Sequence, residues 1–453
     1  WMQLTKKKMT KKVNVKLALT AATTALLGAP CAANATTPEL DTWSFDTAVL
    51  YYGEVDRVTA TEVLLGATKT FEDDSVLSLK FTFDSLTGAS PNGAVAQPTT
   101  QTFTRPSGNG EYQTPANETP IYDGFRDTRV QFNGQWTQPL ASNYTVSGGV
   151  HLSKEFDYLS LGINSSLAYD FNKKNSTFSV GGSYFQDTYN PVGNIPEPLA
   201  VMIAGSGDAD IDDPTRIGKD DTKSTADIIF GFTQVINRRM IMMANYSYSM
   251  VDGYLNDPYK RLSRVNANGE AVDYVYESRP DSRSKQSVFT QAKYNFGGQL
   301  LNNTILDVSY RYMWDDWQID SHTVDSRFYI PIGTNSYLEP HFRIYQQSAA
   351  EFYQPFLNET DALPTYASAD LRIGEMTTYT LGLKYGTFVN GDDELSFRLE
   401  YYRQKPTNAG FDEPGVLASQ DLNKTLFTVY PNPIQSMHLY IMNIIQKVHL
   451  VYF

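Results

Sequence analysis

The stretch YLSLGINSSLAYDF, residues Tyr158–Phe171, alternates apolar and polar side chains and indicates the class of the whole fold. Its odd positions are apolar except for Ser165, and the even positions from Ser160 onward are small or polar. A period of two residues is that of a β-strand with two different faces. The same alternation recurs at residues 306–314 and 395–402. We expect the apolar faces to contact lipid, because Arg or Lys there costs about 2–4 kcal/mol at mid-bilayer.

Long insertions occur only at alternate hairpins of the predicted strands. We place strands at residues 42–54, 57–71, 76–87, 125–138, 143–156, 158–172, 176–188, 226–237, 239–251, 284–296, 303–314, 324–332, 336–347, 377–389 and 395–404, with a closing strand after Asn423. Long insertions follow the third, seventh, ninth, thirteenth and fifteenth strands, all odd in number. Membrane barrels have short periplasmic turns and long outer loops. We therefore predict an all-β fold: a transmembrane antiparallel β-barrel of about sixteen strands, with long extracellular loops. A water-soluble barrel with its two faces reversed is the alternative.

The N-terminal residues have the composition of a secretory signal. Six lysines between Lys6 and Lys16 precede the largely apolar run 17–27, and Ala33-Asn34-Ala35 supplies small residues for cleavage. We expect residues 1–35 to be a signal peptide with upstream read-through, Met9 being the start, and residues 36–453 to be the barrel. The single cysteine, Cys31, then leaves with the signal. The location predicted is the outer membrane of a Gram-negative bacterium.

Composition and charge narrow the class of protein further. The chain has 453 residues, 13% of them aromatic, and a mean hydropathy of −0.37. Beyond the signal, no apolar run approaches the length of a membrane helix. The net charge of −13 becomes −19 without the six N-terminal lysines, which disfavours nucleic acid as a partner. The partners expected are outer-membrane lipid and lipopolysaccharide and the barrel assembly machinery, and a protein inside the lumen is a further candidate.

The faces opposite the apolar ones carry many charges, which the predicted strand phase directs into the lumen. Two interpretations remain open: the charges line a selective aqueous path, or they pair across the lumen and brace it. Arg outnumbers Lys, and its planar fork suits pairing with carboxylates or binding of a carboxylate or phosphate. The residues are Lys80, Asp84, Arg129, Asp307, Arg311, Asp325, Arg327, Glu339, His341, Arg343, Lys384, Arg398 and Glu400.

Two of the long loops suggest further hypotheses. Residues 89–123 are rich in Pro, Gly, Asn and Thr and show no helix or strand period, so this loop either constricts the lumen or covers its mouth. Residues 205–221 contain Asp208, Asp210 and Asp212, an alternation that resembles the start of a calcium loop. A solvated acidic loop is the alternative, and no other cofactor is expected.

Enzymatic signals are weak, and we expect a protein that is not an enzyme. The segment 314–322 combines Asp316 and His322 near the predicted outer rim, as a rim-located hydrolase would require. The aromatic residues of this segment fit an interfacial girdle better, because Trp favours the membrane surface.

Several phrases resemble a known family. They are LTGASPNG (86–93), QVINRR (234–239), DGYLNDPYK (252–260), RPDSR (279–283), SADLRIGEM (368–376) and RLEYY (398–402). Together they are similar to Gram-negative outer-membrane proteins known as domain of unknown function 3570. The resemblance implies an outer-membrane barrel and assigns no activity.

The C-terminal sequence departs from the usual pattern of such barrels. Pro431 and Pro433 interrupt a strand continuing from Leu426, because proline removes a ladder donor. Either the closing strand lies near residues 439–453, or the reading frame changes after about Thr428.

The leading functional hypothesis is a porin-like pore or small-molecule passage. The alternative is a non-conducting barrel that serves as scaffold or anchor for a partner, and a rim-located hydrolase is a third. The sequence names no solute, partner or oligomeric state.

Overall fold

The structure is a computed structural model that describes residues 43–54, 57–88, 91–106, 110–204, 214–297, 303–389, 393–407, 411–418 and 438–446. The predicted signal, residues 1–35, lies outside them, as do Asp208, Asp210 and Asp212. Long strands dominate the described chain: Trp43–Gly53 (β1), Thr59–Thr70 (β2), Val76–Thr87 (β3), Arg126–Ala141 (β6), Tyr144–Lys154 (β7), Tyr158–Phe171 (β8), Ser176–Tyr189 (β9), Asp221–Asn237 (β12), Met240–Gly253 (β13), Ser282–Asn295 (β16), Ile305–Asp315 (β17), Asp320–Ile332 (β18), Ser336–Gln347 (β19), Glu375–Val389 (β21), Asp393–Thr407 (β22) and His438–Gln446 (β23).

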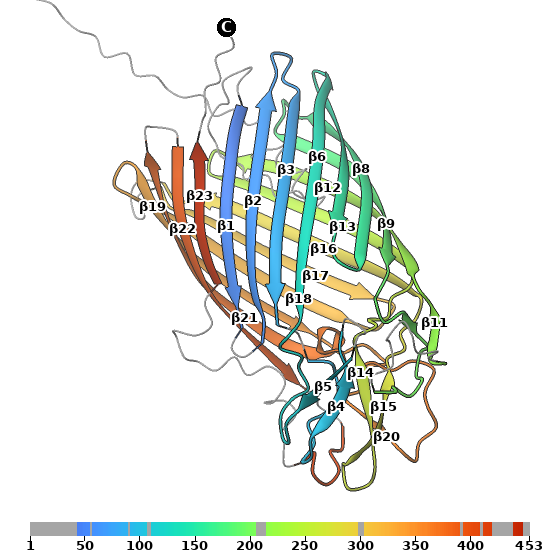
Figure 1. Cartoon of the computed structure of the whole chain (residues 1–453). Coiled ribbons are helices and arrows are strands. Elements are labelled where there is room, and N and C mark those ends of the chain that lie inside the picture. The colour runs from blue at the N-terminus through green and yellow to red at the C-terminus, as the bar shows by residue number, and fades with distance from the viewer. Residues whose placement is uncertain are drawn as a thin grey trace, which may run out of the picture.

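These strands form one large antiparallel sheet (Figure 1). Each pairs with its successor in this series, and β23 pairs with β22 on one edge and with β1 on the other, so that the sheet curls into a barrel. The predicted all-β fold is confirmed. Strand β23 occupies the first part of the segment 439–453, whereas residues 419–437 and 447–453 lie outside the described chain.

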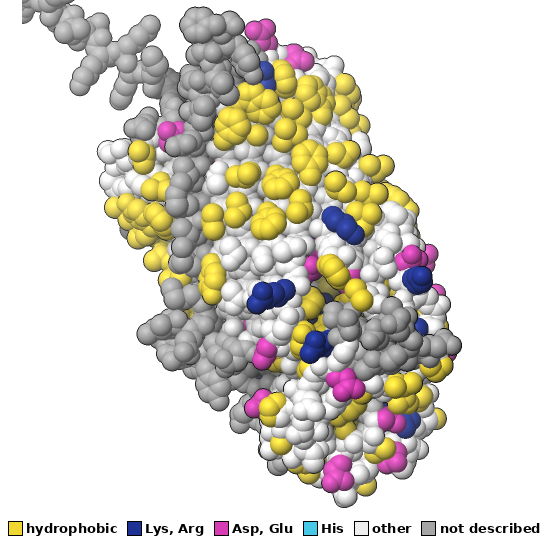
Figure 2. All heavy atoms as spheres, viewed as in Figure 1, with side chains coloured by type: hydrophobic (Ala, Val, Ile, Leu, Met, Phe, Trp, Pro, Cys, Tyr) yellow, Lys and Arg dark blue, Asp and Glu magenta, His cyan; other side chains and the backbone are white. Residues whose placement is uncertain are grey.

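The strand phase predicted from β8 is the one observed. Leu161, Ile163 and Leu167 are 49%, 62% and 40% exposed, whereas Ser160 and Ser166 on the opposite face are buried. Figure 2 shows hydrophobic side chains spread over the outer face of the strands, with charged side chains more frequent toward the loop end. Among the described residues, no helix has the length and apolar character to cross a membrane.

The long connections fold into a unit that we call the cap. It consists of the described residues of five connections: β3 to β6, β9 to β12, β13 to β16, β19 to β21, and β22 to β23. It gathers at one end of the barrel (Figure 1). Its short elements are the hairpin Gln101–Thr104 (β4) and Glu111–Thr114 (β5), the pair Ile195–Pro196 (β10) and Arg216–Gly218 (β11), the sheet Arg261–Val265 (β14), Ala271–Tyr276 (β15) and Leu357–Asn358 (β20), and the 3-10 helix Leu371–Ile373 (η1).

The expectation of no strand period at residues 89–123 was wrong, because β4 and β5 lie there. Strands of four residues are too short for an alternation to stand out from the surrounding loop. Phe103 of β4 is buried against Met202 and Tyr276, so this loop packs into the cap.

The hydrophobic core lies in the cap and in the turn between β17 and β18 that packs against it. Of the described buried hydrophobic residues, only Tyr337 and Met376 belong to barrel strands. One cluster joins four connections through Val95, Val265, Phe356 and Leu417. The barrel strands direct most of their large apolar side chains outward, so the described buried apolar residues come mainly from the connections.

Candidate functional site

The inward faces of the barrel strands carry ion pairs between close neighbours. Arg129 Nη2 lies 2.8 Å from Asp84 Oδ2, and Lys384 Nζ lies 3.1 Å from Glu394 Oε1. Asp307 Oδ2 lies 3.1 Å from Nζ of Lys293, which is not among the lumen residues predicted from the sequence. In each case the two residues sit on adjacent strands, β3 and β6, β21 and β22, or β16 and β17.

His341 lies at the centre of the largest group of inward charges. Its Nδ1 is 2.8 Å from Glu400 Oε1, and its Nε2 is 2.8 Å from Asp325 Oδ2. Arg327 Nε lies 3.4 Å from Asp325 Oδ1, and Arg398 Nη1 lies 3.1 Å from Glu400 Oε1. Arg398 also reaches Glu339, with Nη2 2.8 Å from Oε1.

Gly382 makes room for the contact between His341 and Glu400. These residues lie on β19 and β22, with Gly382 of β21 between them in register. A Cβ at Gly382 would lie 2.9 Å from Glu400 Cγ and 3.1 Å from His341 Cβ. A side chain at this position would therefore separate the pair or displace one of its members.

Two predicted lumen residues differ from the others. Within the described chain, neither Arg311 nor Arg343 has a carboxylate at ion-pair distance, and both are exposed to solvent. Lys285 of β16 likewise has no such partner in the part of the chain that the structure describes. Lys80 has an interaction of its own and does not belong with them.

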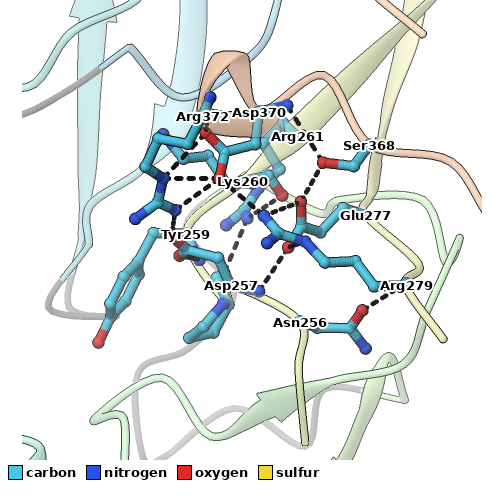
Figure 3. A network of polar contacts seen from close by, with 11 residues as sticks. Asn256, Asp257, Tyr259, Lys260, Arg261, Glu277, Arg279, Ser368, Asp370 and Arg372 are labelled. Carbon is cyan, nitrogen blue, oxygen red and sulfur yellow. Dashed lines mark hydrogen bonds and ion pairs between the residues drawn. The ribbon is translucent and has the colours of Figure 1, made fainter. Parts of the chain in front are cut away.

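The cap contains a second group of charges, most of them buried, which Figure 3 shows. Arg279 bridges two carboxylates: its Nε is 2.7 Å from Glu277 Oε1, and its Nη2 is 2.8 Å from Asp370 Oδ2. The side chains of Glu277, Asp370 and Arg279 are only 1%, 2% and 9% exposed. Arg372 Nη2 lies 2.6 Å from both Asp370 Oδ2 and Asp257 Oδ2.

This buried network joins connections that are distant in sequence. Asp257 and Arg279 follow β13, whereas Ser368 and Asp370 precede β21. Ser368 Oγ donates to Glu277 Oε2 at 2.6 Å, and Lys260 Nζ donates to the Pro91 carbonyl at 2.7 Å, which ties in the connection after β3. The phrases 252–260, 279–283 and 368–376 supply most of the network. Because its charged groups pair with one another across these connections and Glu277, Arg279 and Asp370 are buried, the network is a clamp that holds the cap together.

The charge state of Asp370 gives the clamp a pH dependence. Burial alone would raise the pKa of Asp370, but Lys260, Arg372 and Arg279 outweigh burial and hold that pKa well below its usual range. A carboxyl with a lowered folded-state pKa stabilises the fold above its unfolded pKa of about 3.9, and this stabilisation is lost as the pH falls through the folded-state pKa.

We therefore expect the stability difference between the wild type and Asp370→Asn to be full at pH 7 and to shrink progressively below about pH 4. Fluorescence of Trp317, which lies in the turn between β17 and β18 and packs against Phe352 and Leu371 of the cap, reports unfolding by denaturant across this range. A difference that stays constant from pH 7 to pH 2 would contradict the assignment of a charged Asp370.

The residues of the rim hydrolase hypothesis are divided among separate contacts. Asp316 accepts the Ser284 backbone N–H at 2.9 Å, and Trp317 is buried with its Nε1 donating to the Ser282 carbonyl at 2.9 Å. His322 lies on the outer face, with Nδ1 2.7 Å from the Tyr310 hydroxyl and its ring stacked on Tyr312. The structure thus brings His322 to the aromatic residues of the segment and not to Asp316.

The calcium hypothesis rests on residues outside the described chain. Among the residues that the structure does describe, no group of three or more His, Cys, Asp or Glu side chains is arranged to hold a metal ion. A calcium ion at Asp208, Asp210 and Asp212 stays a prediction.

Comparison with solved structures gives matches at very low sequence identity. The siderophore receptor PirA from Acinetobacter baumannii is 9% identical with a TM-score of 0.40, covering 82% of this chain and 54% of its own. A mutant of the ferric enterobactin receptor PfeA from Pseudomonas aeruginosa, in complex with enterobactin, is 10% identical with a TM-score of 0.42, covering 82% and 55%. The outer membrane transporter YddB from Escherichia coli is 8% identical with a TM-score of 0.35, covering 81% and 60%. The chain thus spans a little over half the length of these proteins.

Sequence comparison gives a more specific result. No curated protein matches the sequence. The model of the family described as Protein of unknown function (DUF3570) matches residues 16–430, most of the chain. The predicted resemblance is therefore confirmed, and the chain belongs to this family of unknown function.

Proposed function

We propose that the protein is a sixteen-stranded transmembrane barrel of a Gram-negative outer membrane and that it passes small polar solutes through its lumen. One observation supports the proposal of a passage: the inward ion pairs run along the wall. Each joins residues on one strand, on adjacent strands, or on strands separated by a single strand, as with His341 and Glu400. No ion pair of the described strands crosses the lumen, so the paired charges brace the wall and leave the centre to water.

The two faces of the strands support the membrane location. The outward residues are large and apolar, including Ile163, Phe342 and Ile344, which are 62%, 55% and 49% exposed. Exposed apolar area on this scale is unfavourable in water and favourable against lipid tails. Outer-membrane lipid and lipopolysaccharide are therefore the proposed surroundings, and the barrel assembly machinery is the proposed route of insertion. The proposal includes no catalytic step.

The cap favours a second candidate function. Four hydrophobic clusters and the buried network make it a folded unit at the barrel mouth. A mouth covered by a folded unit suits a non-conducting scaffold or anchor as well as a narrowed passage.

Conductance in a planar lipid bilayer separates the two candidates. Folding of the purified protein is first verified by its shifted electrophoretic mobility before and after heating. We expect discrete current steps whose size rises with salt concentration. A verified barrel that stays silent from 0.1 to 1 M salt would overturn the passage and support the scaffold.

A further inference from the structure

We infer that the lumen binds small anionic solutes carrying a carboxylate or phosphate group, at a basic cluster formed by Lys285, Arg311 and Arg343. The inference rests on the proposed function, because it names the solute class that the passage takes. It begins from the contrast between these three residues and the other inward cations.

Other inward cations are neutralised locally. Arg129, Lys293, Lys384 and Arg398 each have a carboxylate within 3.1 Å, and Lys223 has Asp187 at 3.5 Å. If the inward charges served only to brace the wall, we would expect the remaining cations to be paired with carboxylates as well, because a paired charge fixes two neighbouring strands. In the described chain Lys285, Arg311 and Arg343 depart from this rule, although the protein as a whole carries a charge of −13.

The pairing register places Arg311 and Arg343 near each other in the wall, and Lys285 lies four positions closer to the cap than Phe289, the residue opposite Arg311. They lie on β16, β17 and β19, which with β18 are consecutive neighbours in the sheet. Arg311 lies opposite Thr323, Thr323 lies opposite Tyr345, and Arg343 lies two positions from Tyr345 on the same strand face. Arg311 and Arg343 are therefore separated in the sheet by one strand and by two positions along it.

Two of the neighbouring carboxylates pair with other cations, and a third, Asp227, lies one strand beyond Lys285 in register and accepts from Ser183 Oγ at 2.8 Å. Asp325 is the cross-strand neighbour of Arg343, but its carboxylate binds His341 Nε2 at 2.8 Å and Arg327 Nε at 3.4 Å. Asp315 lies opposite Lys285 and pairs instead with Arg283. The cluster therefore retains an excess of positive charge that faces the lumen.

The position of the cluster suits capture of a solute. Arg311 and Arg343 lie in the halves of β17 and β19 that end at Asp315 and Gln347, the ends next to the cap. Guanidinium groups present paired donors that match the oxygens of carboxylates and phosphates, and exposed ones bind such anions without a large desolvation cost. An anion that passes the cap meets Arg311 before the paired charges around His341, and it meets Arg343 at the level of Asp325.

The test measures binding and ion selectivity on the same detergent-folded protein. Inorganic pyrophosphate and citrate are the two probes, titrated by calorimetry, and the reversal potential is read in a tenfold KCl gradient. We expect binding of at least one probe and a preference for chloride. Each of Arg311→Gln and Arg343→Gln should lower probe affinity about fivefold, the factor that corresponds to one unit charge at contact distance in water.

Two matched variants control for the loss of positive charge. Arg403→Gln removes an arginine from the outer face, and Arg129→Gln removes one that is paired with Asp84 in the lumen. Neither should change probe affinity. A conducting barrel that binds neither probe and prefers cations would overturn the anion site and leave the passage intact. Probe binding to a silent barrel would support the anion site and overturn the passage, and an equal effect of all four variants would overturn the site.

Discussion

Replacing Arg279 with alanine is expected to unfold the cap while the barrel stays folded. The substitution leaves Glu277 and Asp370 charged and buried, at 1% and 2% exposure, without the cation that bridges them. Removing one partner of a buried ion pair costs about 3–5 kcal/mol, a large fraction of the stability of a small folded unit. Limited proteolysis should show rapid cleavage within the cap, and hydrogen exchange should show loss of protection in β14 and β15.

Arg264 provides the matched control in the same unit. It pairs with Asp273 between β14 and β15, but both side chains are 22% exposed. Arg264→Ala should therefore cost about 1 kcal/mol or less and leave the cleavage pattern unchanged. If Arg279→Ala and Arg264→Ala had the same small effect, the buried network would not be the clamp of the cap.

Replacing Ile163 with arginine is expected to destabilise the barrel in lipid by about 2–4 kcal/mol. Ile163 lies near the middle of β8, is 62% exposed, and belongs to the outward apolar face. A charge there would be held against lipid tails, where hydration is lost. The measurement is the free energy of unfolding by guanidinium in phospholipid vesicles.

The neighbouring residue distinguishes a lipid effect from a general intolerance of arginine. Asn164 lies on the inward face of the same strand, so Asn164→Arg places an equal charge in the lumen. Its cost in lipid should be clearly smaller than that of Ile163→Arg. Equal losses of unfolding free energy for the two variants would argue against a lipid-facing β8. A loss for Ile163→Arg that is abolished by added salt would argue against it as well.

The pairing of the lumen charges could be predicted only in part. The sequence indicates that His341, Asp325 and Glu400 face inward, because each strand has its own alternation. It does not indicate that they meet: His341 and Glu400 are separated by 59 residues and contact each other across Gly382. The same limit applies to Arg311 and Arg343, whose lack of a close carboxylate among the described residues depends on the register of four strands.

By itself, the sequence determined the strands, their two faces and the side on which the long loops lie, because alternation and loop length are local properties of the chain. The tertiary structure alone decided that these loops share a hydrophobic core and a buried ion network. Val95, Val265, Phe356 and Leu417 come from four separate connections, and Arg279 reaches Asp370 across 91 positions. No local pattern encodes such contacts, because burial in the cap results from loops that the barrel brings to one end.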